Sequence, residues 1–273
     1  MIRVLRAGLL SSVLFLFIVF IATPCLADFR FAVMGDSRGN DDGINTKILP
    51  RLLEQLKSDK PEFIVFVGDL ITGSKYSDEH RKRLLKWKAI IEDYGIPVYI
   101  VVGNHEITSE RSETILKSIF GDLTYSFNHE NAHFVILDTA VYKNFNRIDE
   151  TQLEWLKNDL EKNDKDIVYI FGHSPAYPVS HHIGSSLDKY PAERDRLWGI
   201  FKKYGVDVYF CGHEHLYDKT LHDDILQVIT GGAGANLRAR PENGGFYHYV
   251  IVDVSDDGTW TTIPKKLETP TEP

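Results

Sequence analysis

The feature of this sequence that most restricts its fold is a local pattern that occurs five times. In each case a short apolar run, rich in β-branched or aromatic residues, meets a glycine, and a side chain able to bind metal follows directly. Such runs are typical of buried strands, and open α/β sheets place their ligand groups at the carboxyl ends of their strands. The pattern therefore predicts an α/β protein with a polar site at its strand ends. The five motifs are Gly35-Asp36, Gly68-Asp69, Gly103-Asn104, Gly172-His173 and Gly212-His213.

The segments around these motifs predict the rest of the fold. Strands and helices alternate early in the chain and antiparallel strands follow, which indicates an α/β fold of two packed mixed β-sheets flanked by helices. Residues 174–190 form a long irregular stretch, and ordered loops of this length are often functional. Helices are expected at residues 44–57, 78–94, 112–120 and 192–204, with another that Asp149 or Thr151 caps and that ends at residue 160. Strands are expected at residues 29–34, 63–67, 97–102, 125–128, 133–138, 167–171, 206–210, 226–230, 247–254 and 259–263.

Length and charge limit the kind of protein this is. The 273 residues can bury a sizeable core, and we expect one domain over residues 28–266 followed by a flexible tail at residues 267–273. The formal charge is −8, from 31 basic and 39 acidic side chains. An acidic surface argues against broad binding of nucleic acids or anionic membranes. A small phosphate-ester substrate is compatible with it, because bound metal ions would supply local positive charge.

Residues 1–27 have the composition of a secretory signal peptide. Arg3 and Arg6 form a basic start, an apolar run follows, and small residues stand at the expected cleavage position after Ala27. An uncleaved membrane anchor is the alternative. Cleavage would leave Cys211 as the only cysteine, so no intrachain disulfide is expected. Export without disulfides favours a secreted protein of a bacterial periplasm.

The motif residues and a later histidine form a candidate metal-binding set. They offer hard oxygen and borderline nitrogen ligands without a thiolate, which suits Mn, Fe, Zn or similar divalent ions and does not choose among them. Two such ions about 3.5–4 Å apart need a bridging carboxylate, and Asp69 is the best candidate. Such a pair generates hydroxide from water and holds the oxygens of an in-line displacement at phosphorus. The candidate ligands are Asp36, Asp69, Asn104, His173, His213 and His215.

These motifs, in this order, resemble the calcineurin-like metallophosphoesterase family over most of the chain after the leader. The resemblance implies that His105 hydrogen-bonds the substrate phosphate and protonates the leaving oxygen. It also implies one ion held by Asp36, Asp69 and His215, and another held by Asp69, Asn104, His173 and His213. The residues that carry the resemblance are Gly35-Asp36-Ser37-Arg38, Gly68-Asp69, Gly103-Asn104-His105-Glu106, Gly172-His173 and Gly212-His213-Glu214-His215.

The sequence departs from the family pattern at Arg38, where the first motif usually has a histidine. Arginine has no lone pair to offer a metal, so we expect the first ion to bind weakly. Its planar guanidinium suits contact with phosphate oxygens, which makes Arg38 a candidate catalytic residue; the alternative is that it only braces an acidic loop such as Asp41-Asp42. Tyr217 resembles the purple acid phosphatase branch, but Thr72 stands where that branch has an iron-binding tyrosine. We therefore expect no purple iron site.

Other polar residues near the motifs have simpler interpretations. Glu106 and Glu214 are expected to brace loops rather than to bind metal. His133 alternates with apolar residues in a strand and is expected to be structural. His181 and His182 lie in the long irregular stretch, where solvated loop residues are the favoured interpretation and substrate contact is the alternative.

Together these features predict an exported, metal-dependent phosphoesterase that acts on a small phosphate ester through a metal-activated hydroxide. The nearest alternative is a phosphodiesterase or nucleotide pyrophosphatase. A non-catalytic module that binds metal or phosphate is the alternative from another class. The presence of His105 and of every second-site ligand favours the enzyme. Substrate choice is expected to depend mainly on residues 174–190, whose sequence does not name the substrate.

Overall fold

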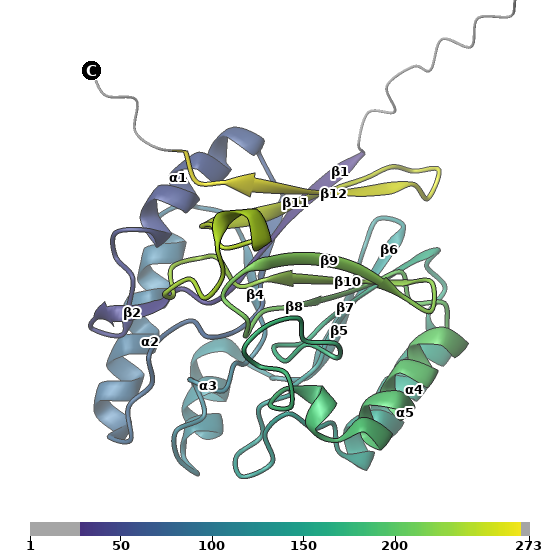
Figure 1. Cartoon of the computed structure of the whole chain (residues 1–273), viewed down its shortest axis with the longest axis horizontal. Helices are drawn as coiled ribbons and strands as arrows, with labels where there is room; N and C mark the ends of the chain where they lie inside the picture. The colour runs from purple at the N-terminus through teal and green to yellow at the C-terminus, as the bar shows by residue number, and fades with distance from the viewer. Residues whose placement is uncertain (1–27, 269–273) are drawn as a thin grey trace, which may run out of the picture.

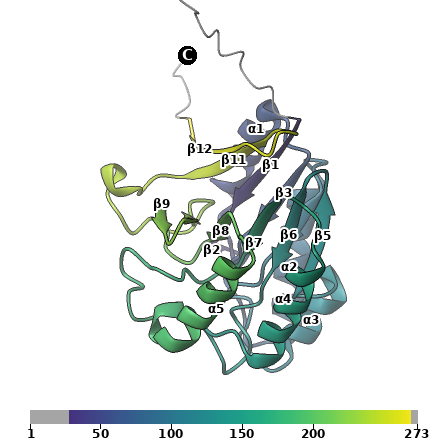
Figure 2. The same cartoon turned by 90° about the vertical axis from the view of Figure 1, so that its right-hand side faces the viewer.

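The computed structural model describes residues 28–268 and shows two β-sheets packed face to face, with helices outside each (Figures 1 and 2). This confirms the predicted pair of mixed sheets. Within the described residues, the first sheet has the order β12-β11-β1-β3-β4, with bounds β1 Phe29–Met34, β3 Phe63–Phe66, β4 Val98–Ile100, β11 His248–Val254 and β12 Trp260–Lys266. The second has the order β5-β6-β7-β8-β10-β9, with bounds β5 Tyr125–His129, β6 Ala132–Ile136, β7 Ile167–Phe171, β8 Val208–Cys211, β9 Tyr217–His222 and β10 Ile225–Thr230.

The helices lie in two groups on the outer faces of the sandwich (Figure 1). The group that packs on the first sheet consists of α1 Leu49–Asp59, α2 Ser77–Glu92 and α3 Ser112–Phe120. The group that packs on the second sheet consists of α4 Glu150–Lys162 and α5 Pro191–Lys203. Short elements outside both sheets are the strand β2 Arg38–Asp41 and the 3₁₀ turns η1 Leu187–Lys189 and η2 Pro241–Asn243.

Strand β1 shows why these apolar runs form buried strands. Its odd-numbered residues, including Phe31, face the layer between the sheets, and its even-numbered Met34 packs toward α1 and α2. A strand covered on both faces is a continuous apolar run, as the sequence pattern requires. Rings from the two sheets interlock in the middle layer, where Phe31 lies 5.4 Å from Phe63 in its own sheet and 5.1 Å from Phe134 of β6 (ring centroids).

The strand directions bring the motif residues to one edge. Strands β1, β3 and β4 are parallel to one another, and so are β6, β7, β8 and β10. The residues that follow β1, β3 and β4 therefore meet those that follow β7 and β8, because the two sheets are stacked. Strand β11 is antiparallel to β1, and β9 is antiparallel to β10, so both sheets are mixed.

Two details differ from the sequence prediction. The helix predicted at residues 44–57 begins only at Leu49, because the Asn45 side chain accepts the backbone N–H of Ile48 and Pro50 fits only in a first helical turn. Strand β9 was not predicted, since its residues are mostly polar. It is a sheet edge whose Leu221 is 61% exposed, and edge strands need no continuous apolar run.

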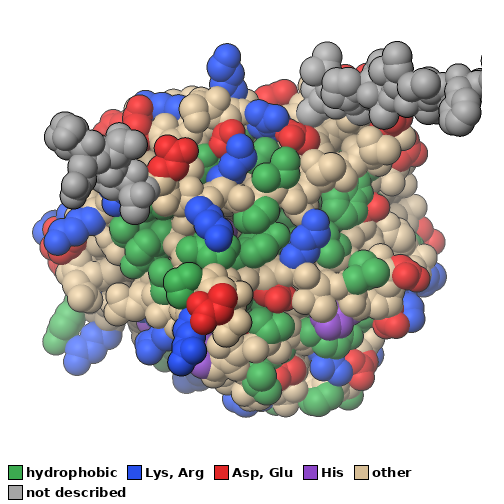
Figure 3. All heavy atoms as spheres, turned by 45° about the horizontal axis from the view of Figure 1, so that its top comes forward, with side chains coloured by type: hydrophobic (Ala, Val, Ile, Leu, Met, Phe, Trp, Pro, Cys, Tyr) green, Lys and Arg blue, Asp and Glu red, His purple; other side chains and the backbone are tan. Residues whose placement is uncertain are grey.

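Both ends of the chain lie outside the range that the structure describes. The predicted signal peptide, residues 1–27, lies outside the described residues, as do residues 269–273 of the predicted flexible tail. The first two tail residues are anchored, because the backbone N–H of Leu267 donates to the Tyr247 carbonyl and that of Glu268 donates to Gln55. Among residues 28–268, no helix combines the length and apolar character needed to cross a bilayer. On the face shown in Figure 3, basic side chains are interspersed with acidic ones.

Candidate metal centre

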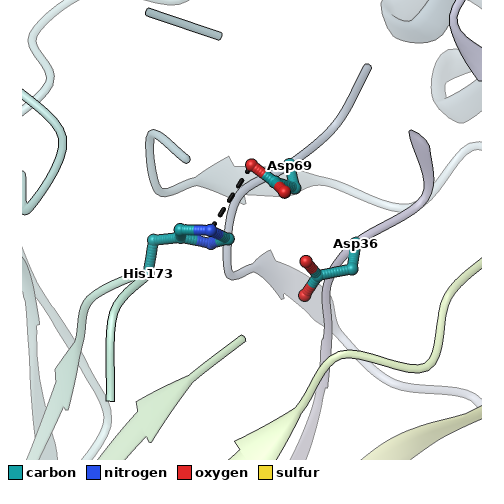
Figure 4. A group of neighbouring side chains, drawn as sticks. All are labelled: Asp36, Asp69 and His173. Carbon is teal, nitrogen blue, oxygen red and sulfur yellow. Dashed lines mark ion pairs between the residues drawn. The ribbon is translucent and has the colours of Figure 1, made fainter. Parts of the chain in front are cut away.

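The carboxyl ends of strands from both sheets bring the predicted ligands together. Asp36 follows β1 and Asp69 follows β3 in the first sheet, whereas His173 follows β7 and His213 follows β8 in the second. The sheets are joined here, because the backbone N–H of His213 donates to Asp36 at 3.0 Å. In Figure 4 the carboxylates of Asp36 and Asp69 and the ring of His173 point toward one another, and all three are buried. Their ligand atoms lie within 4.8 Å of one another.

The backbone is unusual at these ligands. Asp36, Asp69 and His213 have positive φ angles of 63°, 52° and 69°. Residues with side chains seldom adopt this conformation, and it is maintained at functional sites by the surrounding structure. A Cβ added at Gly103 would collide with Asp69, and one at Gly212 would lie 2.5 Å from the Asp36 carboxylate. Glycine at these two motifs therefore lets the backbone and a predicted ligand approach closely.

The predicted second-ion ligands form a cluster of lone-pair atoms around His173. Its Nδ1 lies 2.8 Å from the Val67 carbonyl, which can only accept, so Nδ1 carries a proton and the neutral ring has its lone pair on Nε2. That Nε2 lies 3.1 Å from Asn104 Oδ1 and 3.2 Å from His213 Nδ1. It lies 3.4 Å from Asp69 Oδ1. Acceptors that converge in this way on a buried point are stabilised by a cation, and this donor set suits a divalent metal ion.

The predicted first-ion ligands are arranged in a similar way. His215 Nδ1 donates to the Asn236 carbonyl at 2.7 Å, so its Nε2 also has a lone pair. That Nε2 lies 3.6 Å from Asp36 Oδ1, a buried oxygen that accepts no hydrogen bond from any described residue. Burial raises the pKa of Asp36 well above its usual value, the nearby Asp69 charge adds to this, and Arg38 opposes it.

Arg38 lies among the predicted first-ion ligands. Its Nε donates to Asp69 Oδ2 at 3.2 Å, and its Nη2 lies 3.3 Å from His215 Nε2. The Arg38 side chain is 23% exposed, so part of the guanidinium faces solvent. Asp41 and Asp42 have other partners, which shows that Arg38 does not brace the acidic loop. The structure instead places its positive charge between two of the predicted first-ion ligands, Asp69 and His215.

His105 lies at the open rim of the centre. Its side chain is 33% exposed, and its Nε2 is 3.9 Å from Asp69 Oδ2. The backbone N–H of His105 donates to Asp69 Oδ1 at 3.0 Å, which holds the histidine beside the ligands. Burial lowers the pKa of His105, the Asp69 charge opposes this, and the Arg38 charge lowers it further. The position leaves the imidazole accessible to a bound substrate.

Glu106 and Glu214 brace loops, as predicted. Glu106 is fully buried and accepts three backbone N–H groups, from Asp69 at 2.9 Å, Gly103 at 2.9 Å and Ile71 at 3.1 Å. Burial raises the pKa of Glu106 well above its usual value, and the neighbouring Asp69 charge adds to this. Glu214 accepts backbone N–H groups of the irregular 174–190 stretch. Both carboxylates therefore fix the loops that carry or cover the ligands.

The irregular stretch lies closer to the centre than a solvated loop would. The His182 ring is 3.8 Å from that of His213, and the His181 ring is 6.1 Å from that of His215 (centroids). Burial lowers the pKa of His182 to about 4, with His181 adding to the effect. His182 therefore packs against a predicted ligand, and its contact with substrate stays a prediction. The two adjacent histidines were a signal in the sequence for this position. The path of the loop that brings them near His213 could not be predicted from the sequence.

A pocket of about 240 Å³ adjoins Arg38 and His215. Lys47 and Arg238 also line it, so its positive side chains outnumber the single carboxylate of Asp41. Sequence reasoning missed the contributions of Lys47 and Arg238, because neither stands in a motif. A larger hollow of about 410 Å³ between α3 and α4 contains none of the motif residues. The smaller pocket is the one connected to the chemistry.

Comparison with known proteins agrees with this geometry. The mouse (Mus musculus) protein acid phosphatase type 7 is 31% identical over 224 residues, covering 74% of this chain and 50% of that protein. Purple acid phosphatase 23 of Arabidopsis thaliana is 24% identical over 247 residues, covering 75% of this chain and 51% of that protein. The chain thus spans about half the length of these curated relatives. A purple acid phosphatase structure from yellow lupin (Lupinus luteus) seeds has the same fold, with a TM-score of 0.69 at 18% identity, covering 87% of this chain and 51% of that one.

The family match covers the whole metal centre. Residues 29–217 match the description calcineurin-like phosphoesterase. This range runs from the first residue of β1 to Tyr217, two residues after the last predicted histidine ligand, so it includes every motif residue from Asp36 to His215. The chain therefore belongs to the calcineurin-like phosphoesterase family, a family of phosphoester hydrolases.

Proposed function

We propose that this chain is an exported, metal-dependent phosphoesterase that hydrolyses small phosphate esters. The observation that carries the proposal is the convergence of Asn104 Oδ1, His213 Nδ1 and Asp69 Oδ1, all atoms able to bind metal, on His173 Nε2. These residues would hold a divalent ion. When bound there, such an ion lowers the pKa of water toward neutrality and polarises a phosphoryl oxygen.

The chain's own residues would supply the remaining steps. Arg38 has five N–H donors, of which two point at protein acceptors, so others remain for a phosphate oxygen. His105 at the rim would donate a proton to the leaving oxygen. The bond from His173 Nδ1 to the Val67 carbonyl keeps the ring in the tautomer and orientation that metal binding needs.

The adjoining pocket supports a small, polar, anionic substrate. Its volume of about 240 Å³ and the side chains of Lys47 and Arg238 match a phosphate ester better than an apolar ligand. A phosphodiesterase or nucleotide pyrophosphatase remains the alternative enzyme. A module that binds metal or phosphate without turnover is the alternative outside enzymes.

Hydrolysis of nitrophenyl phosphate and bis(nitrophenyl) phosphate tests the proposal. Protein stripped of metal should be inactive, and Mn, Fe or Zn should restore turnover, with the monoester hydrolysed faster. His173→Ala should lose more than about 100-fold, because even residues behind metal ligands contribute about 10–100-fold. His129→Ala is the matched control, since His129 pairs with Glu62 and contacts Phe29 at the opposite end of β1 from Asp36. Metal binding without turnover of either ester would favour the binding module.

Export is proposed from the composition of the leader. The mature protein would then begin at Asp28 and appear in a periplasmic or extracellular fraction. Intact-mass analysis of that fraction is the measurement. Protein that retains Met1 in the membrane fraction would contradict it.

A further inference from the structure

The atoms expected to hold the first metal ion already have a cationic partner. Arg38 Nε donates to Asp69 Oδ2 at 3.2 Å, and Arg38 Nη2 lies 3.3 Å from His215 Nε2. Because His215 Nδ1 donates to the Asn236 carbonyl, His215 Nε2 has one lone pair, and Arg38 is positioned to use it. A metal ion at this position would need the same lone pair at about 2.0–2.1 Å. The ion and the guanidinium therefore compete for one site.

The guanidinium cannot make room by losing its charge. Arginine stays protonated in proteins, so an ion placed beside Arg38 would meet a fixed like charge. The same side chain has a positive role in this position, because two buried carboxylates, Asp36 and Asp69, lie next to each other. In this chain Arg38 offsets part of that negative charge without any metal.

Asp69 shows how the two cations would share the centre. Its Oδ2 accepts from Arg38, whereas its Oδ1 lies 3.4 Å from His173 Nε2 in the lone-pair cluster. The carboxylate predicted to bridge two ions is thus arranged to bridge one ion and one guanidinium. Among the described residues, no Lys or Arg side chain forms a hydrogen bond or ion pair with His173, Asn104 or His213.

Asp36 lies closer to the ligands predicted for the second ion than His215 does. Asp36 Oδ1 has no hydrogen-bond partner among residues 28–268, and the Asp36 carboxylate groups with Asp69 and His173 within 4.8 Å. His215 is not part of that group. Asp36 is therefore available to the ion at His173, while His215 is left to Arg38.

We propose that the Arg38 guanidinium replaces the first metal ion, so that the centre takes one divalent ion rather than two. This inference deepens the proposed function and concerns the same site. The ion would be held by Asp69, Asn104, His173 and His213, with Asp36 beside it. The substrate phosphate would then meet one metal ion and one arginine.

The number of bound ions tests this directly and does not depend on turnover. Purified full-length mature protein is equilibrated with Mn²⁺, and metal content per chain is measured together with the electron paramagnetic resonance spectrum. The wild type should bind one Mn²⁺ and show the spectrum of an isolated ion. Arg38→His and Arg38→Ala should each bind two, with the spin-coupled spectrum of neighbouring ions, and Arg38→His should bind the added ion more tightly.

Arg238→Ala is the control, because it removes a positive charge from the same pocket and leaves the ligands untouched. It should bind one ion, like the wild type. Two tightly bound ions in the wild type, or one ion in both Arg38 variants when circular dichroism shows them folded, would overturn the proposal. One ion in a wild type that hydrolyses neither ester would instead refute the proposed function and leave this inference standing.

Discussion

At the scale of single residues, the position of one proton decides what each histidine can do. His173 and His215 each donate a hydrogen bond from Nδ1 to a backbone carbonyl, so that Nε2 of the neutral ring is an acceptor. Both carbonyls are backbone groups, so the sequence did not identify them as hydrogen-bond partners of these histidines. Within the part of the chain that the structure describes, no backbone carbonyl holds the His105 ring, which lies at the rim beside Asp69. The first two are therefore suited to hold a cation, and the third is suited to transfer a proton.

The role of His105 predicts a dependence on the leaving group. General acids contribute about 10²–10⁴-fold to rate, and their contribution falls when the leaving group is already a weak base. We expect His105→Ala to reduce kcat for alkyl phosphates by about that factor and to affect nitrophenyl phosphate much less. The aryl ester serves as the internal control in the same preparation. Equal losses on both esters would show that His105 only positions the substrate.

At the scale of elements, the stability of the fold depends on how its helices begin. Helix α4 starts where Asp149 Oδ1 accepts the backbone N–H of Gln152 at 2.8 Å, which confirms one of the two caps predicted for it. The Gln152 side chain then bonds the backbone N–H and carbonyl of Asp138 after β6. The cap therefore fixes α4 against the outer face of the second sheet.

Removing this cap should lower the stability of the fold without changing catalysis. Replacing a capping side chain with alanine costs about 0.5–2 kcal/mol. We expect Asp149→Ala to lower the free energy of unfolding in urea by this amount with kcat/KM unchanged. Asp149→Asn keeps an acceptor oxygen at the same position and should stay near the wild type. If both variants lost stability equally, the charge of Asp149 would be responsible, rather than its hydrogen bond.

At the scale of the whole molecule, the ligands are held by the packing of two sheets. Phe134 of β6 is fully buried and lies 5.1 Å from Phe31 and 5.3 Å from Phe63 of the first sheet (centroids). It also stacks on Phe127 at 4.9 Å within its own sheet. Since Asp36 and His213 come from different sheets, loss of this packing would disturb the metal centre as well as the core.

Truncation of Phe134 should therefore destabilise both sheets together. Substituting a buried phenylalanine with alanine costs about 3–5 kcal/mol. We expect Phe134→Ala to lower the unfolding free energy by that amount in one cooperative transition, followed by circular dichroism and by loss of metal binding. Leu221→Ala, at a side chain that is 61% exposed, should change it by less than about 0.5 kcal/mol. Separate transitions for the two signals would indicate that the sheets unfold independently.

Part of the fold and of the candidate site could be predicted from the sequence, because the information for those parts is local. A strand ending in glycine and then Asp69 or His173 can be recognised from a few adjacent residues, and so can the two-sheet class and the helix cap at Asp149. The first residues of helices and the presence of polar strands were harder to predict from the sequence. The first residue of α1 depends on an Asn45 side-chain bond, and the polar edge strand β9 exists because β10 offers it a free edge.

The sequence by itself determined the candidate ligands, because their order and type and the departure at Arg38 follow from side-chain chemistry. Only the tertiary structure decided where they meet. His213 donates its backbone N–H to Asp36 across 177 residues of chain, and Arg38 lies against His215 across another 177. Such contacts are set by the stacking of two sheets, and no local pattern encodes their distances. The place of the Arg38 charge, among the ligands of an expected metal ion, is therefore a property of the fold.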